Sequence, residues 1–332
     1  MDMKKLINDP EDVVDEMLDG MVAAYPDRVR RLDDTKVLVR DDAPVEGKVG
    51  VVSGGGSGHE PTHAGYLGPG MLDGAAAGEM FTSPTADELN EMIAAADGGE
   101  GVLCVVKNYE GDVMNFDTAA EMAGMETDAD VAQVLVDDDV AVEDSTYTSG
   151  RRGVCGTILV HKVAGAMADR GGDLEEVQRV AEKAVERVGT MGMALTSCIT
   201  PDKGEPTFDL GDDEVELGIG IHGEPGVERT EQMPADDVAD ELTEAVLSDI
   251  DPEGEVVTIV NGMGGTPQME LFVVNRRVQQ ILDDRGLETW DAWVGDYMTS
   301  LDMEGCSVTV MDVDDELKDL LSHEADTPAL KR

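Results

Sequence analysis

The chain has 332 residues, 41% of them hydrophobic, and its 24 basic and 73 acidic residues leave a net charge of −49. This length indicates two domains, and the hydrophobic content provides a core for each, which argues against disorder. So negative a chain repels nucleic acid and anionic membranes, and acidic residues spread along its whole length are typical of a halophilic organism with molar salt in its cytoplasm.

The first half of the chain predicts an α/β domain. A helix is expected to begin at Pro10 with Asp9 as its N-cap, and Asp173 is the expected N-cap of a later helix. The expected strands are 37–39, 49–53, 102–106 and 131–136, and the expected helices are 84–96, 115–124, 154–169 and 174–188. Their alternation implies a mainly parallel sheet.

The second half repeats this alternation. Its expected strands are 193–197, 215–219, 256–260, 289–294 and 307–311, and its expected helices are 235–247 and 268–284. The predicted fold is therefore α/β, with two α/β domains that each hold a largely parallel or mixed sheet flanked by helices. We expect an N-terminal domain over residues 1–185 and a C-terminal domain over residues 186–332.

The cysteines and the apolar runs indicate where the protein works. Four cysteines lie far apart in or beside apolar segments, which predicts buried free thiols; they are Cys104, Cys155, Cys198 and Cys306. No apolar run reaches the roughly 18 residues of a membrane helix. We therefore expect a soluble, cytoplasmic protein.

Two glycine-rich segments each place a histidine beside Glu-Pro. The first runs from Ser53 to Pro61 and holds His59, and the second runs from Gly220 to Pro225 and holds His222. Each follows an expected strand, and open α/β sheets bind ligands beyond the carboxyl ends of their strands. The glycines between Ser53 and His59 predict a loop whose backbone N–H groups approach a ligand closely. The alternatives are a tight structural connection and a hydrogen-bonded core histidine.

Two other pattern matches are disfavoured by their context. The segment from His59 to His63 fits the zinc-protease pattern H-E-x-x-H, which needs a regular helix, but Pro61 removes a backbone donor in its middle. Residues 218–223 fit the dinucleotide pattern G-x-G-x-x-G, yet Pro225 stands where the receiving helix would begin. Zinc hydrolysis is therefore a minor alternative, and we expect no metal site.

A further set of polar residues follows the strand expected at 102–106. Lys107 and Asp112 place a cation and a carboxylate five residues apart at the carboxyl end of this strand, which favours a binding role over a surface salt bridge. The run from Asp137 to Asp139 could bind a cation, but in so acidic a chain a solvated turn is the better interpretation.

The motifs, taken in order, closely resemble the dihydroxyacetone-binding K subunit of dihydroxyacetone kinases. The resemblance spans nearly the whole chain through the segments 53–61, 81–85, 107–109, 111–112, 137–142, 150–153, 220–226, 299–303 and 327–330. It implies that His222 adds through an imidazole nitrogen to the substrate's carbonyl carbon and forms a reversible hemiaminal. Glycerol, which has no carbonyl, could not form this bond.

The resemblance also implies the remaining site residues. Gly56, Lys107 and Asp112 would hold the substrate hydroxyls, and His59 and Asp112 would act as acid and base on the hydroxyl to be phosphorylated. The neighbouring Ser57 and Gly58 are expected to contact the substrate as well.

No nucleotide or metal cofactor is expected in this chain. The resemblance implies a partner L subunit that carries the nucleotide with Mg²⁺ and is fed by the phosphoenolpyruvate-dependent phosphotransferase system, and it implies a homodimer of the K chain. The alternatives are an ATP-fed version, a kinase subunit for another short keto-sugar such as erythrulose, and a non-catalytic carbonyl-binding regulator. A regulator would keep His222 and lose His59 and Asp112, and both are present.

Overall fold

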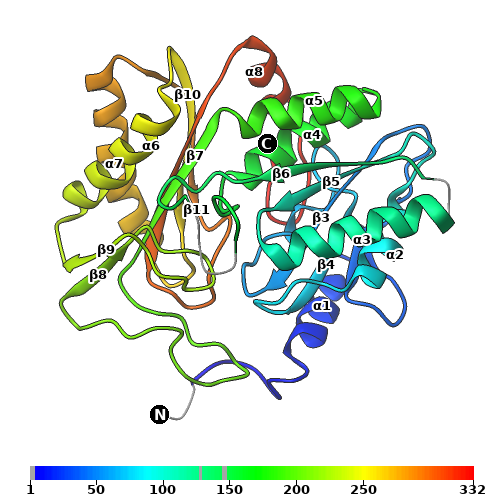
Figure 1. Ribbon diagram of the computed structural model, residues 1–332, viewed down its shortest axis with the longest axis horizontal. Helices are drawn as coiled ribbons and strands as arrows, with labels where there is room; N and C mark the ends of the chain where they lie inside the picture. The colour runs from blue at the N-terminus through cyan, green and yellow to red at the C-terminus, as the bar shows by residue number, and fades with distance from the viewer. Residues whose placement is uncertain (1–3, 127–128, 144–147) are drawn as a thin grey trace.

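Two six-stranded sheets form the frame of the protein (Figure 1). The computed structural model describes residues 4–126, 129–143 and 148–332. The first sheet has the strand order β1-β2-β4-β3-β5-β6, with β1 Val29–Arg31, β2 Val37–Arg40, β3 Gly50–Ser57, β4 Gly74–Met80, β5 Val102–Lys107 and β6 Val131–Val136. The four strands from β4 to β6 are parallel, and β1 and β2 are antiparallel. The mainly parallel sheet predicted for the first half is confirmed.

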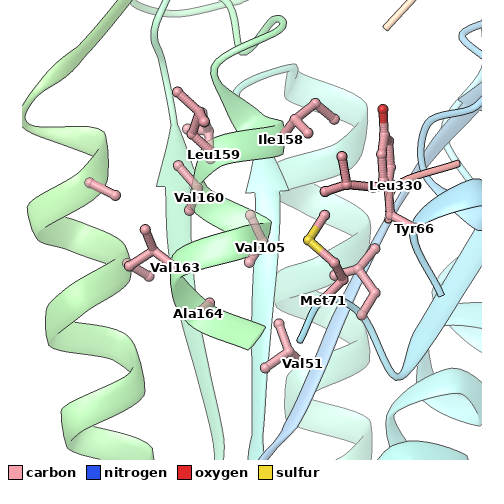
Figure 2. Packing of buried hydrophobic residues seen from close by; sticks show 14 of the residues in the cluster. Val51, Tyr66, Met71, Val105, Ile158, Leu159, Val160, Val163, Ala164 and Leu330 are labelled. Carbon is pink, nitrogen blue, oxygen red and sulfur yellow. The ribbon is translucent and has the colours of Figure 1, made fainter. Parts of the chain in front are cut away.

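Helices cover both faces of this sheet because its central strands are apolar on both sides. On one face, α2 (Ala86–Ala96) and α3 (Glu110–Glu126) pack against side chains such as Val52 and Val106. On the other face, α4 (Thr157–Asp169) and α5 (Leu174–Val185) pack against the alternate residues. Figure 2 shows this second layer, in which Ile158, Leu159 and Val163 of α4 lie near Val51 and Val105.

The second sheet is mostly antiparallel. Its order is β11-β10-β12-β7-β8-β9, with β7 Val188–Ala194, β8 Glu214–Leu217, β9 Glu228–Glu231, β10 Glu255–Gly262, β11 Glu288–Gly295 and β12 Gly305–Asp312. Among the described strands of this sheet, β10 and β11 form the one parallel pair. Helices α6 (Ala235–Ile250) and α7 (Gln268–Arg285) cover its outer face. Two sheets flanked by helices, with parallel and mixed pairing, confirm the predicted fold class.

The two sheets share one apolar core. Val257 and Ile259 of β10 belong to the same buried cluster as α4. The short helix α8 (Asp315–Leu321) packs on α4, and beyond it Leu330 returns to Tyr66 of the first half (Figure 2). The division of the chain between residues 185 and 186 stays a prediction, and the shared core shows that the two halves are packed together.

The helix ends show where cap signals succeeded. Asp173 accepts a hydrogen bond from the N–H of Glu176, whose side chain bonds back to the Asp173 N–H, so the cap prediction for α5 is confirmed. The prediction for Asp9 is wrong, because α1 begins later and spans Val13–Ala24. The Asp9 side chain instead accepts from the N–H of Glu11 in a turn that precedes the helix.

All four cysteines are buried and free, as predicted. In the part of the chain that the structure describes, no helix has the length and apolar character needed to cross a membrane.

Candidate active site

A cavity of about 680 Å³ lies where the two halves meet. The first half contributes Gly56, Tyr109 and Asp112 to its wall, and the second half contributes His222 and Glu224. The carboxyl ends of β3 and β5 and the loop after β8 therefore converge on one site. This is the place at which parallel α/β sheets offer ligand sites.

The glycines before His59 are part of strand β3, which corrects the prediction of a loop. Neighbouring segments approach this strand too closely for side chains. A Cβ on Gly55 would stand 2.3 Å from Nζ of Lys107, and one on Gly56 would stand 2.5 Å from the backbone N of Thr82. The glycines thus serve close approach within a sheet, and the chain leaves the strand only at Gly58, whose φ is +106°.

His59 is 1% exposed and is held by the main chain of the second half. Its Nδ1 lies 2.8 Å from the carbonyl oxygen of Thr299 and donates to it, so the proton is on Nδ1. Its Nε2 is buried without a hydrogen-bond partner among the described residues. Burial, followed by the nearby His222 and Lys107, holds the pKa of His59 well below its usual value. His59 is therefore a neutral imidazole with a free acceptor nitrogen.

Lys107 and Asp112 form a buried ion pair, which confirms that these two residues lie together. Lys107 is the last residue of β5 and is 1% exposed, and its Nζ is 3.1 Å from Oδ2 of Asp112. Helix α3 starts at Glu110 rather than at the expected residue 115, so Asp112 lies in its first turn. Ser83 donates a short hydrogen bond to Oδ1 of Asp112. A pair of this kind presents both a donor and an acceptor for hydroxyl groups.

His222 follows β8 in an irregular turn and is positioned by Glu224. Its Nδ1 lies 2.7 Å from Oε1 of Glu224, and its backbone N–H donates to Oε2 at 2.9 Å. Burial by itself would raise the pKa of Glu224, but His222 and Arg152 overcome that effect and lower it to about 2. The ionised carboxylate accepts the Nδ1–H, so a neutral His222 imidazole would carry its lone pair on Nε2.

Aromatic rings enclose the His222 imidazole. Its centroid lies 4.8 Å from that of His59, 4.6 Å from that of Tyr109 and 5.3 Å from that of Phe81, each in an edge-to-face arrangement. The two glycine-flanked histidines thus meet at one site although 163 positions separate them in the sequence. A neutral imidazole with a free nitrogen can add to a carbonyl carbon, and the adjacent ion pair can hold its hydroxyl groups.

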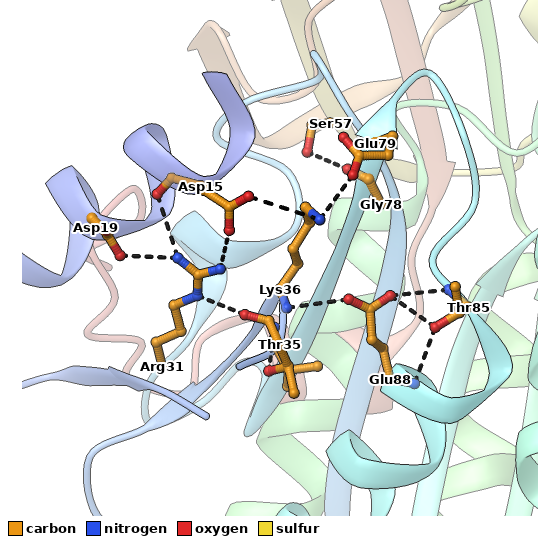
Figure 3. Close-up of polar contacts among 11 residues, drawn as sticks. Asp15, Asp19, Arg31, Thr35, Lys36, Ser57, Gly78, Glu79, Thr85 and Glu88 are labelled. Carbon is orange, nitrogen blue, oxygen red and sulfur yellow. Dashed lines mark hydrogen bonds and ion pairs between the residues drawn. The ribbon is translucent and has the colours of Figure 1, made fainter. Parts of the chain in front are cut away.

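Two of the expected contact residues lie beside the cavity. The hydroxyl of Ser57 donates to the carbonyl of Gly78 at 2.7 Å and so ties β3 to β4 (Figure 3). The N–H of Gly58 donates to the carboxylate of Glu60. Neither Ser57 nor Gly58 is among the described residues that line the cavity.

The zinc-protease pattern has no helix beneath it. The segment from His59 to His63 forms turns that lead into a short 3-10 helix, Ala64–Tyr66. The rings of His63 and His161 lie 5.3 Å apart, so His63 faces α4 rather than the cavity. Within residues 4–126, 129–143 and 148–332, no group of three or more His, Cys, Asp or Glu side chains is arranged to hold a metal ion.

The run from Asp137 to Asp139 is not a solvated turn, because Asp138 and Asp139 are each 2% exposed. Asp138 accepts the N–H groups of Val154 and Gly156. Asp139 pairs with the fully buried Arg152. The sequence could not predict these structural roles, because most carboxylates in so acidic a chain are solvated.

Several residues around the site have no role that could be predicted from the sequence. They are Phe81, Ser83, Tyr109, Arg152 and Glu224. All of them fall within or next to the motifs that carried the resemblance. Their proximity to the histidines depends on tertiary structure, and spacing along the chain gives no sign of it.

The Dak1 domain model matches residues 19–329, and the chain belongs to the Dak1 domain family. It is 51% identical to the PTS-dependent dihydroxyacetone kinase 1, dihydroxyacetone-binding subunit DhaK of Listeria innocua, over 98% of this chain and 100% of that protein. Among solved structures, the dihydroxyacetone kinase of C. freundii in complex with AMP-PNP and Mg²⁺ superposes with a TM-score of 0.91 at 34% identity, covering 99% of this chain and 61% of that one.

A regulatory relative has a similar structure. The dihydroxyacetone kinase operon co-activator Dha-DhaQ superposes with a TM-score of 0.88 at 35% identity, covering 95% of this chain and 96% of that one. The chain is therefore similar both to proteins named as kinases and to a protein named as a co-activator.

Proposed function

We propose that this chain is the dihydroxyacetone-binding subunit of a dihydroxyacetone kinase and that it works in the cytoplasm. The observation that carries the proposal is the His222–Glu224 contact of 2.7 Å at the wall of the cavity, beside the Lys107–Asp112 pair. Family membership and 51% identity to a dihydroxyacetone-binding subunit support it.

In the proposed capture step, the Nε2 lone pair of His222 attacks the carbonyl carbon of dihydroxyacetone. An N–C bond forms, the carbonyl π bond breaks, and its electron pair moves to oxygen, which takes a proton from water and leaves a hydroxide ion in the solvent. The imidazole acquires a positive charge, which the Glu224 carboxylate stabilises across the Nδ1–H contact. Glycerol has similar hydroxyl groups but no electrophilic carbon, so this step selects the ketone.

In the proposed transfer step, the captured substrate presents a terminal hydroxyl for phosphorylation. Lys107 and Asp112 hold its hydroxyls, Gly56 allows close approach of the backbone, and His59 or Asp112 accepts the hydroxyl proton. A nucleotide with Mg²⁺ on a partner L subunit would supply the phosphoryl group. We propose that phosphoenolpyruvate feeds this partner and that the K chain is a homodimer.

Calorimetric titration of the purified chain with dihydroxyacetone, and separately with glycerol, tests the capture step. We expect binding of the ketone alone and its loss in His222→Ala, whose side chain is 16% exposed and whose removal leaves the core intact. Equal binding of both compounds, or of neither, would contradict the proposal. The buffer should contain molar KCl, since we also propose a halophilic source for a chain of net charge −49.

The similarity to the co-activator favours a second candidate, a carbonyl-binding regulator. Such a protein would bind the ketone without supporting phosphoryl transfer. The chain keeps Asp112 on the cavity wall and His59 with its ring 4.8 Å from that of His222, which favours the kinase subunit. Adding the nucleotide-loaded L subunit and phosphoenolpyruvate system of a related kinase, and assaying dihydroxyacetone phosphate, separates the two. Erythrulose as a parallel substrate tests the choice of keto-sugar.

A further inference from the structure

Behind His222 lies a buried row of three charged side chains, of which the proposed function uses Glu224 alone. Glu224, which accepts the Nδ1–H of His222, is 2% exposed. Arg152 is fully buried, and Asp139, which binds Arg152, is 2% exposed. Burying three charges is costly unless they compensate one another, so their arrangement calls for a physical reason.

Asp139 and the main chain fix the guanidinium of Arg152 on one side. Nε and Nη2 lie 2.7 and 2.6 Å from Oδ2 of Asp139, and Nη2 also donates to the carbonyl of Gly218 at 2.7 Å. The third nitrogen, Nη1, is buried and has no hydrogen-bond partner among the described residues. Arg152 therefore has one nitrogen that its own anchor does not satisfy.

That nitrogen and the carboxylate of Glu224 both lie beside Gly220. A Cβ built on Gly220 would stand 2.7 Å from Nη1 of Arg152 and 2.1 Å from Oε2 of Glu224. The guanidinium and the carboxylate thus flank the same glycine, and the contacts of the described residues include no direct ion pair between them. The absence of a side chain at Gly220 lets the positive charge act on the carboxylate at short range in a medium of low dielectric constant.

The charge on Glu224 decides which nitrogen of His222 is free. An ionised carboxylate accepts a hydrogen bond from Nδ1–H and leaves the lone pair on Nε2. A protonated carboxyl would donate to Nδ1 instead, and the neutral imidazole would then carry its proton on Nε2. A carboxyl buried in an apolar environment tends to be protonated, so Glu224 needs a nearby cation to stay ionised.

We propose that Asp139 and Arg152 are positioning residues that act through Glu224 to hold His222 as the Nδ1–H tautomer, with Nε2 free to add to a carbonyl. The inference rests on the proposed function, because the tautomer matters only if His222 is a nucleophile. Arg152 keeps Glu224 ionised, and Asp139 keeps Arg152 in place. Asp139 and Arg152 lie before β7 and Glu224 lies after β8, so the row also links segments of both halves.

The other groups around His222 cannot replace this charge. His59 and Tyr109 face its ring, and neither carries a negative charge at neutral pH. Asp112 lines the same cavity, but Lys107 and Ser83 bind its carboxylate. Burial raises the pKa of Tyr109 well above its usual value, so its phenol stays neutral. Glu224 is therefore the carboxylate that sets the state of the imidazole.

Long-range ¹⁵N–¹H NMR of the histidine rings, combined with dihydroxyacetone affinity, tests the inference on the full-length chain. In the wild type we expect the Nδ1–H tautomer at His222. In Arg152→Met we expect the population of the Nε2–H tautomer to rise and the ketone affinity to fall by about 10- to 100-fold. This is the range typical of residues that orient a ligand-binding side chain. Arg152→Lys, which keeps a positive charge, should recover part of the affinity.

Arg151→Met is the matched control, because Arg151 is the adjacent residue, is 36% exposed and pairs with Asp249 on the surface. It should leave both readings unchanged. If Arg152→Met does not fold, Glu224→Gln and the wild-type spectrum decide the question. The inference is overturned if the wild type holds the Nε2–H tautomer, or if Glu224→Gln or a folded Arg152→Met keeps the wild-type affinity. Failure of the wild type to bind any ketone would overturn the proposed function instead, whatever the tautomer.

Discussion

The two halves of the molecule hold their site residues by different means. In the first half, His59 follows strand β3 and Lys107 ends strand β5. The carbonyl of Thr299 holds His59, and neighbouring backbone crowds Gly56. In the second half, an irregular turn carries His222, and side chains fix it, first Glu224 and then Arg152. Substitutions in the first half should therefore disturb both shape and chemistry, whereas His222→Ala, which truncates a partly exposed side chain, should change chemistry with little effect on folding.

The largest expected effect is a loss of phosphoryl transfer in a variant that still captures the ketone. Asp112→Asn keeps the size of the side chain and removes the carboxylate, so phosphoryl transfer should fall by about 100- to 10,000-fold, the usual contribution of a general base. Ketone capture by His222 should persist at reduced affinity. The assay is dihydroxyacetone phosphate formation with a nucleotide-loaded L subunit, alongside calorimetry on the same variant. Loss of capture with unchanged transfer per bound ketone would reverse the assigned roles.

The next largest expected effect is the pH dependence that Glu224 gives to the free energy of unfolding. Its pKa of about 2 in the folded protein lies below the ordinary value of 4.5. The ionised form therefore stabilises the fold above about pH 4.5, and this stabilisation is lost as the pH falls through about 2. The corresponding free energy is on the order of 3 kcal/mol. The difference in unfolding free energy between the wild type and Glu224→Gln should shrink over this range in denaturant titrations. A difference that does not change with pH would show that the carboxylate is not stabilised by its neighbours.

A glycine substitution tests the crowding of the first half. A Cβ at Gly56 would lie 2.5 Å from the backbone N of Thr82 and 2.8 Å from Phe81. Gly56→Ala should therefore lower the unfolding free energy by about 1–3 kcal/mol and weaken ketone binding. Gly124→Ala in α3, where nothing lies within 4 Å, is the control and should be neutral or slightly stabilising. Equal stability of the two variants would argue against the close approach at β3.

The smallest difference between the halves is expected in their response to salt concentration. Acidic residues are spread over both halves, so salt should stabilise the two alike. The melting temperature should rise between dilute buffer and molar KCl as counterions screen the repulsion among carboxylates. Differential scanning calorimetry would measure it. An unchanged melting temperature would contradict the halophilic interpretation.

Apolar runs predicted most strands and helices, and the expected strand at 131–136 coincides with β6. Strand β4 was missed because its Gly-Ala-Ala-Ala-Gly sequence lacks the β-branched and aromatic side chains that signal a strand. The glycines of β3 were assigned to a loop for the same reason. In both cases close packing in the tertiary structure requires small residues. Local secondary-structure propensity does not reflect this requirement.

The residues of the site likewise divide into those that the sequence could predict and those that it could not. His59 and His222 stood out because glycines surround them, and Lys107 because it ends an apolar strand. The row from Asp139 through Arg152 to Glu224 could not be predicted, since its members come from separate segments and one of them lay in an acidic run. Only the folded structure shows that this aspartate is buried and faces a cation.

The central claim is that His222 binds the ketone covalently. The most direct measurement is the ¹³C NMR spectrum of dihydroxyacetone labelled at its carbonyl carbon and added to the purified chain in molar KCl. We predict that the bound signal moves from the ketone region to that of a tetrahedral carbon bonded to oxygen and nitrogen, and that His222→Ala lacks this signal. A saturated complex whose labelled carbon keeps the shift of a free ketone would contradict the account.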